Sequence, residues 1–201
     1  MRRRFVQHKN LLWTVAVLAL VFGSLTRCDS LEESTAGARG TLQLYLTDAP
    51  FPFDLVDSAN VTITRVDLVP AGDSSAIRTV SETTRTFNLL DLRGGVTALL
   101  ADTTLEAGTY AQLRLIVREA AVVLKDGRRF DLQVPSGAQT GIKVLLDGFV
   151  IGADSLSTLT LDFDVSESFV VQGNPDTPAG IHGFLFKPVV RPLSTGVPEA
   201  G

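Results

Sequence analysis

The feature that most restricts the fold is a two-residue alternation of apolar and polar side chains, repeated in short runs along the chain. Leu42, Leu44 and Leu46 alternate with Thr, Gln and Tyr, as in a strand with one buried and one exposed face. The later runs end at Gly, Pro or Asp residues, which favour turns. The predicted strands are 40–47, 60–69, 77–80, 86–92, 110–117, 120–125, 128–134, 141–146, 156–165 and 181–190, with a marginal one at 169–171.

Three local patterns add detail to this series of strands. The apolar positions change phase between Ile63 and Val66, which predicts a β-bulge. Asp126-Gly127 lies between two strand-like runs and predicts a tight hairpin with positive φ at both residues. Val96, Leu99 and Leu100 have helical spacing, so a short helical turn is expected near 96–101.

The fold class follows from what the pattern contains. We find no long amphipathic helix and no alternation of strands with helices, which argues against a parallel doubly wound sheet. Hydrophobic residues make up 45% of the chain, enough for a globular core. We therefore predict an all-β protein, a two-sheet antiparallel β-sandwich over 40–193, with a closed barrel as the alternative.

The N-terminal segment has the layout of a secretory signal peptide. Basic residues at 2–4 precede an uncharged apolar stretch, Leu11 to Leu25. That stretch is short for a bilayer span, which needs about twenty residues, although a permanent transmembrane anchor is the alternative. We predict a signal peptide at 1–27, a flexible tether at 28–39 and a disordered tail at 194–201.

Cys28 is the only cysteine in the chain and stands where the apolar stretch ends. The arrangement resembles a bacterial lipoprotein signal, in which this cysteine becomes the lipid attachment site of the mature protein. Leu25 and Thr26 fit that pattern, whereas Arg27 stands where a small residue is usual. The alternative is an incidental thiol near a conventional cleavage site. The lipidated form would be held at a bacterial membrane, outside the cytoplasm.

The mature chain would be acidic. Five of the eighteen Lys and Arg residues precede Cys28, so removal of the signal leaves thirteen basic and 22 acidic residues, a net charge of −9. No basic stripe is present to follow a phosphate backbone, so we expect no nucleic-acid partner. With a single cysteine, no disulfide can form within the chain.

Few residues in the mature chain could carry out catalysis. Its one histidine, His182, has no cysteine or histidine cluster beside it in sequence, as a zinc site would need. We also find no Gly-x-Ser-x-Gly motif and no glycine-rich phosphate loop. We therefore expect no enzyme activity, no catalytic residue and no cofactor.

An acidic group is the one candidate for a metal site. Asp162 and Asp164 lie two apart in a predicted strand and would project the same way, about 7 Å apart. If Asp48 or Asp54 came close, the carboxylates would suit calcium, which prefers oxygen ligands. The alternative is a solvent-facing edge, or carboxylates that cap turns and pair with Arg114, Lys143 or Arg191. A glycosidase pair would need an apolar pocket to raise one pKa, and the sequence indicates none.

Several short motifs occur together in one order. They are TDAP at 47–50, NLLDL at 88–92, AGTYxQLRL at 107–115, PSG at 135–137, LDFD at 161–164 and KPVVR at 187–191. In this order they resemble a family of bacterial and archaeal secreted lipoprotein domains of unknown function. The resemblance implies a β-sandwich in the cell envelope and assigns no catalytic residue. Some of its members continue into a second β-sandwich similar to carboxypeptidase regulatory or carbohydrate-binding modules.

The function expected from the sequence is that of a noncatalytic, membrane-anchored envelope lipoprotein. Its β-sandwich would serve as a binding or structural module for a protein or polysaccharide partner. Sugar binding is the lesser form of this hypothesis, because the chain offers few aromatic residues besides Phe. The alternative is a secreted hydrolase that uses the paired carboxylates.

Overall fold

The computed structural model describes residues 37–48, 54–135, 140–174, 176, 180–195 and 199–200, with side chains as far as Leu193. All of them belong to one compact unit, Gly37–Gly201. The predicted signal peptide 1–27, Cys28 and most of the predicted tether 28–39 lie outside the described residues.

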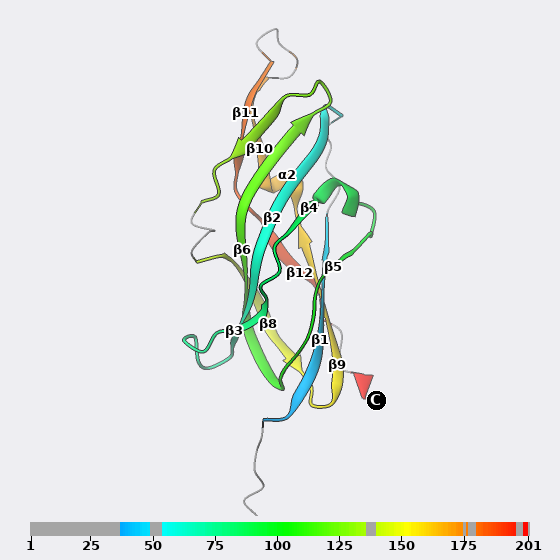
Figure 1. The fold of residues 1–201 in the computed structure, drawn as a ribbon, viewed down its shortest axis with the longest axis vertical. Coiled ribbons are helices and arrows are strands. Elements are labelled where there is room, and N and C mark those ends of the chain that lie inside the picture. The colour runs from blue at the N-terminus through cyan, green and yellow to red at the C-terminus, as the bar shows by residue number, and fades with distance from the viewer. Residues whose placement is uncertain are drawn as a thin grey trace, which may run out of the picture. The chain divides into compact units, whose positions relative to one another are not determined.

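The first sheet is built around two strands that are distant in sequence. Its strands lie in the order β12-β9-β1-β5, with a short β13 also paired to β9 (Figure 1). Strand β1 runs parallel to β9 and antiparallel to β5. The bounds are β1 Arg39–Thr47, β5 Ala98–Glu106, β9 Ser155–Phe163, β12 Val190–Thr195 and β13 Glu199–Ala200.

The second sheet is centred on two long antiparallel strands, β2 and β6. Strands β3 and β4 pair with β2 on one side, and β7 and β8 pair with β6 on the other. Every pairing in this sheet is antiparallel. The bounds are β2 Val56–Pro70, β3 Arg78–Ser81, β4 Arg85–Asn88, β6 Gly108–Leu124, β7 Arg129–Leu132 and β8 Ile142–Ile151.

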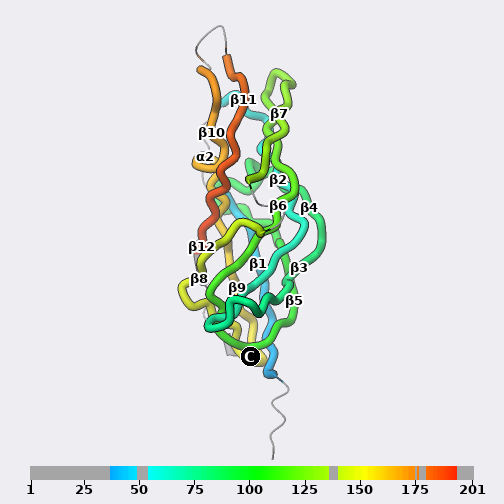
Figure 2. The backbone as a smooth tube through the Cα atoms, turned by 90° about the vertical axis from the view of Figure 1, so that its left-hand side faces the viewer, coloured from blue at the N-terminus to red at the C-terminus, as the bar shows by residue number. Residues whose placement is uncertain are grey.

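A two-stranded hairpin continues the first layer beyond β9. It consists of β10 (Phe169–Asn174) and β11 (Gly180–Phe186), and the one-turn helix α2 (Val165–Ser168) connects it to β9. The ring of Phe184 packs edge-on against Phe130 of β7, with 5.5 Å between the ring centroids. Figure 2 shows this hairpin on one side and β2, β6 and β7 on the other.

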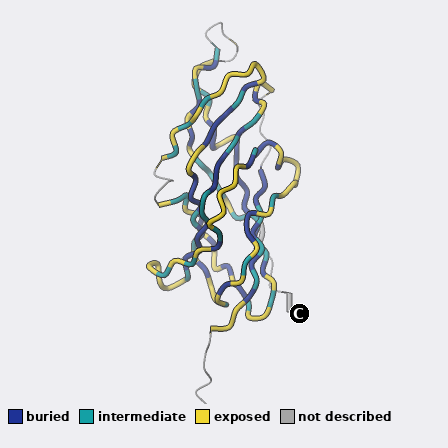
Figure 3. Tube along the Cα trace, in the orientation of Figure 1, coloured by how far each residue is buried: buried dark blue, intermediate teal, exposed yellow. Residues whose placement is uncertain are grey.

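The alternation in the sequence places apolar side chains between the two sheets. Leu42, Leu44 and Leu46 of β1 are completely buried, as are Leu113 and Leu115 of β6. Buried and exposed residues alternate along the strands in Figure 3. The all-β sandwich is therefore confirmed, and the bulge is confirmed by register shifts between β2 and β6 at Ile63.

The expected helical turn near 96–101 is wrong, because Ala98–Glu106 forms strand β5. Val96 and Leu99 are both exposed, whereas Leu100 and Ala101 are consecutive buried residues. A register shift opposite Leu44 and Tyr45 accounts for the consecutive pair, since it leaves Leu100 without a direct partner. One-turn helices instead form at η1 (Leu89–Leu92), where a strand was predicted, and at α2.

Three further expectations need correction. The sandwich is not wholly antiparallel, because β1 and β9 are parallel. The Asp126-Gly127 hairpin is present, but only Gly127 has positive φ, and β6 runs unbroken through the two strands predicted before it. The chain predicted as a disordered tail from 194 continues β12 to Thr195 and forms β13, so pairing with β9 extends beyond the expected domain boundary.

Gly40 is expected to tolerate no side chain. A Cβ at this position would collide with the backbone oxygen of Gly152 and lie 2.9 Å from the Ile151 side chain. Because a backbone oxygen cannot move aside cheaply, Gly40→Ala should lower the free energy of unfolding by about 2 kcal/mol. Gly37→Ala is the matched control, since its nearest contact would be an ordinary 3.9 Å to Glu106. Urea denaturation compares them, and equal stabilities would contradict this reading.

Candidate functional site

The parallel pairing of β1 with β9 brings the predicted acidic residues to one place. Thr47 is in register with Asp162, so Asp48 and Asp164 follow at the ends of neighbouring strands. All three carboxylates are buried, with exposed fractions of 5% for Asp48, 9% for Asp162 and 8% for Asp164. Together with nearby chain segments they form what we call the motif junction, which comprises residues 47–48, 89–93, 162–168 and 187–191.

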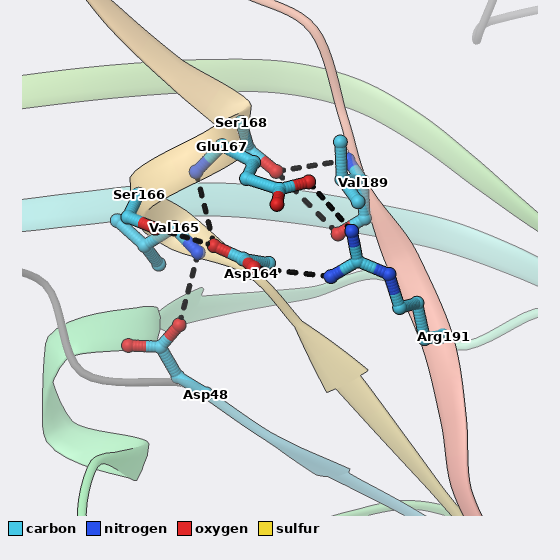
Figure 4. A network of polar contacts seen from close by, with 8 residues as sticks. All are labelled: Asp48, Asp164, Val165, Ser166, Glu167, Ser168, Val189 and Arg191. Carbon is cyan, nitrogen blue, oxygen red and sulfur yellow. Dashed lines mark hydrogen bonds and ion pairs between the residues drawn. The ribbon is translucent and has the colours of Figure 1, made fainter.

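Asp48 is the least exposed acidic residue of the motif junction, and Figure 4 shows its side chain beside the start of α2. Its Oδ1 accepts the backbone N–H of Val165, the first residue of α2, at 3.1 Å. Its Oδ2 is buried and has no hydrogen-bond partner. Burial, followed by repulsion from Asp162 and Asp164, raises the pKa of Asp48 to about 7 against the opposing effects of the Val165 N–H and of Arg93.

The pKa of Asp164 is shifted in the opposite direction, because both of its carboxyl oxygens accept hydrogen bonds. As the N-cap of α2, its Oδ1 accepts the Glu167 N–H at 3.0 Å and the Ser166 hydroxyl at 2.8 Å. Its Oδ2 accepts from Arg191 at 3.1 Å, and Arg191 also donates to Glu167 at 2.6 Å. Burial acts to raise the pKa of Asp164, but these bonds outweigh it and the pKa is lowered.

Backbone hydrogen bonds hold α2 against the segment that precedes β12. The N–H of Asp164 donates to the oxygen of Val189 at 3.0 Å, and the N–H of Lys187 donates to the oxygen of Ser168 at 2.8 Å. The completely buried Ser168 hydroxyl accepts the N–H of Val189 at 2.9 Å. The LDFD and KPVVR motifs are therefore parts of one hydrogen-bonded unit.

The TDAP and NLLDL motifs join the same unit from the other side. The single proton of the Thr47 hydroxyl can go to the backbone oxygen of Val96, at 2.8 Å, or of Leu92, at 3.1 Å. The N–H of Asp48 donates more weakly to Leu92, at 3.4 Å. In NLLDL, the Asn88 side chain caps η1 by accepting the N–H of Leu90. Four motifs spread over 145 residues of sequence thus converge on one place in the fold.

The calcium interpretation of Asp48, Asp162 and Asp164 finds no support in this geometry. No group of three or more His, Cys, Asp or Glu side chains in the described part of the chain could hold a metal ion. Both oxygens of Asp164 accept protein hydrogen bonds, and Asp48 gives one oxygen to the backbone. The alternative reading, in which a carboxylate caps a turn and pairs with Arg191, describes Asp164.

Sequence reasoning missed Ser168 and the helical nature of 165–168. A signal was present, because Asp164 is followed three residues later by Glu167, the spacing of a capping box at the start of a helix. Ser168 itself carries no sequence signal, since its role depends on a partner 21 residues away.

Surface hollows lie away from the motif junction. One of about 320 Å³ lies between β5 and the turn that joins β3 to β4, with Val80 and Ala101 among its lining residues. Another of about 170 Å³ lies over Ala120 and Ala121 on the second sheet, edged by Asn60, Glu119 and Arg129. The junction carboxylates line neither of them. His182 is exposed on β11.

Within the residues that the structure describes, no helix is long and apolar enough to cross a membrane.

Comparison with known proteins identifies a family and no individual relative. No curated protein and no solved structure matches the chain. One family model matches residues 39–188, which span β1 to β11 and the motif junction up to residue 188. The chain therefore belongs to the family described as a domain of unknown function, DUF4382.

Proposed function

We propose that this protein is a noncatalytic lipoprotein of the bacterial cell envelope, anchored to a membrane through Cys28. Its β-sandwich would serve as a binding or structural module for a protein or polysaccharide partner. The acidic mature chain disfavours a nucleic-acid partner.

The noncatalytic part of the proposal is supported by the hydrogen bonds of the motif junction, in which polar side chains bind other parts of the protein. Asp164 and Arg191 bind each other and the first turn of α2, and Ser168 binds the backbone at Val189. Groups bonded in this way hold chain segments together, which is a structural task. A catalytic carboxylate must reach a substrate, whereas Asp48 is 95% buried.

The hydrolase alternative rests on one observation. Asp48 has a raised pKa and two neighbouring carboxylates, the combination that a general acid requires. The oxygen of Asp48 that has no hydrogen-bond partner, Oδ2, is fully buried, however. A substrate could reach that atom only if the motif junction opened, so we keep the noncatalytic proposal.

The anchoring part rests on the sequence before the described residues. A basic start, an uncharged apolar stretch and a single cysteine three residues after its end follow the order of a lipoprotein signal. Acyl chains on Cys28 would then place the domain at a membrane surface, and two or more chains make such binding stable.

The test is fractionation of cells that express the full chain, followed by mass spectrometry of the N-terminal peptide. We expect the protein in the membrane fraction, with its mature chain starting at Cys28 and carrying a diacylglyceryl group. Cys28→Ser should lose the lipid and leave the membrane fraction. An intact Met1 terminus in the cytosol would contradict the proposal, as would a membrane-bound Cys28→Ser protein.

A further inference from the structure

The surroundings of Asp48 favour the protonated form of its carboxyl group. One carboxyl oxygen binds the first N–H of α2, and the other has no partner in the protein. A neutral carboxyl group can stay in such a place at modest cost. A carboxylate there would hold a buried charge on an oxygen that nothing solvates, which is far more costly.

The charges around Asp48 also favour its protonated form. Asp162 approaches from β9 and Asp164 from the start of α2, and both oppose a negative charge on Asp48. Arg93, after η1, is the cation that favours it. Arg191 of β12 is engaged by Asp164 and Glu167 and offers Asp48 no bond in the described structure. Loss of the Asp48 proton therefore adds a charge that its neighbours do not neutralise.

The contact made by Asp48 connects two parts of the fold. It joins the end of β1 to α2, and α2 in turn holds Lys187 and Val189 through hydrogen bonds. Both strands of the β10–β11 hairpin begin or end at these bonds. An opening at Asp48 would therefore loosen the base of that hairpin, while the β2–β6 pairing lies in the other sheet.

We propose that the motif junction is a proton-linked latch, which is closed while Asp48 carries a proton and opens locally more often as rising pH removes that proton. Opening admits water to the carboxylate, so the charge that is costly in the closed form is hydrated in the open one. Proton linkage makes the open form about a hundredfold more populated at pH 8 than at pH 5. The latch is independent of the anchoring proposal, because it needs no membrane and no partner.

Amide hydrogen exchange of the full chain tests the latch. The reporters are the backbone amides of Val165, Lys187 and Val189, whose hydrogen bonds form the junction. Their protection factors should fall about a hundredfold from pH 5 to pH 8. At both pH values they should stay below those of Val66 and Leu115, which are paired in the centre of the second sheet.

Two variants separate the role of Asp48 from other effects of pH. In Asp48→Asn the three reporter amides should show the same protection at both pH values, because no proton can be lost. Asp147→Asn, an exposed position on β8, should behave as the wild type. If Asp48→Asn does not fold, the wild-type comparison still tests the proposal, because protection that does not change from pH 5 to pH 8 overturns it.

Three results would overturn the latch. Reporter amides as protected as Val66 and Leu115 at both pH values would mean that the junction opens only when the whole domain unfolds. Wild-type protection that does not change with pH would mean that Asp48 does not control the opening. The same fall in Asp48→Asn as in the wild type would assign the effect to another group.

Discussion

The Asp48→Asn variant is expected to be more stable than the wild-type chain by about 4 kcal/mol at pH 8, and by less than about 1 kcal/mol at pH 4. Asn keeps the shape of a protonated Asp and its oxygen can still accept the Val165 N–H. It cannot ionise, so it avoids the buried charge that the wild type acquires.

The direction of this pH dependence follows from where the proton is held. In the unfolded chain Asp48 loses its proton near its ordinary pKa of 3.8, whereas in the folded chain it keeps it to about 7. Between these values the folded state binds more protons, so wild-type stability falls as the pH rises through this window. Above about pH 7 the loss is complete and the difference from Asp48→Asn levels off.

Urea denaturation at several pH values, followed by far-ultraviolet circular dichroism, measures the difference. Circular dichroism is the probe because the chain's single Trp, at position 13, lies before the described residues. Asp147→Asn serves as the control, because this residue on β8 is exposed and is not among the groups that shift the pKa of Asp48. Wild-type and Asp48→Asn curves that run parallel from pH 4 to pH 8 would refute the buried-charge argument.

The strand pattern made the fold class predictable from the sequence, because a period of two leaves few ways to bury one face. Leu42, Leu44 and Leu46 of β1 show this directly, since all three are buried as their alternation predicts. The same rule failed at 96–101, where the exposed Val96 and Leu99 imitate helical spacing and a bulge places Leu100 and Ala101 inside together. Local periodicity cannot distinguish the two cases over so few residues.

Strand pairing was less predictable than strand existence. The parallel pair β1–β9 joins residues more than 100 positions apart, and nothing within either segment specifies its partner. That pairing nevertheless decides the candidate site, because it places Asp48 beside Asp162. The sequence therefore singled out carboxylates that the fold brings together, but only the structure shows that Asp164 is bonded while Asp48 retains an unpartnered oxygen.

Phe186→Ala is expected to lower the free energy of unfolding by about 4 kcal/mol. The ring of Phe186 is 1% exposed and is stacked on Phe163, with 6.3 Å between the ring centroids, and tilted against Phe169 at 5.0 Å. Truncation removes both ring contacts and leaves a cavity between β9 and the hairpin, where neighbouring strands are fixed by their own ladders and cannot collapse to fill it.

Two further variants, one at Phe186 and one at the residue before it, show whether the loss of stability comes from the ring or from any change in this part of β11. Phe186→Leu keeps most of the apolar volume, so it should cost about half as much as Phe186→Ala. Leu185→Ala changes the next residue of β11, which is 41% exposed, and should stay within about 1 kcal/mol of the wild type. Similar losses for Phe186→Ala and Leu185→Ala would contradict the placement of Phe186 in the core. If the losses of stability follow this order, the cluster of Phe163, Phe169 and Phe186 supplies much of the packing that keeps the motif junction in place. The polar bonds of the junction then fix its geometry.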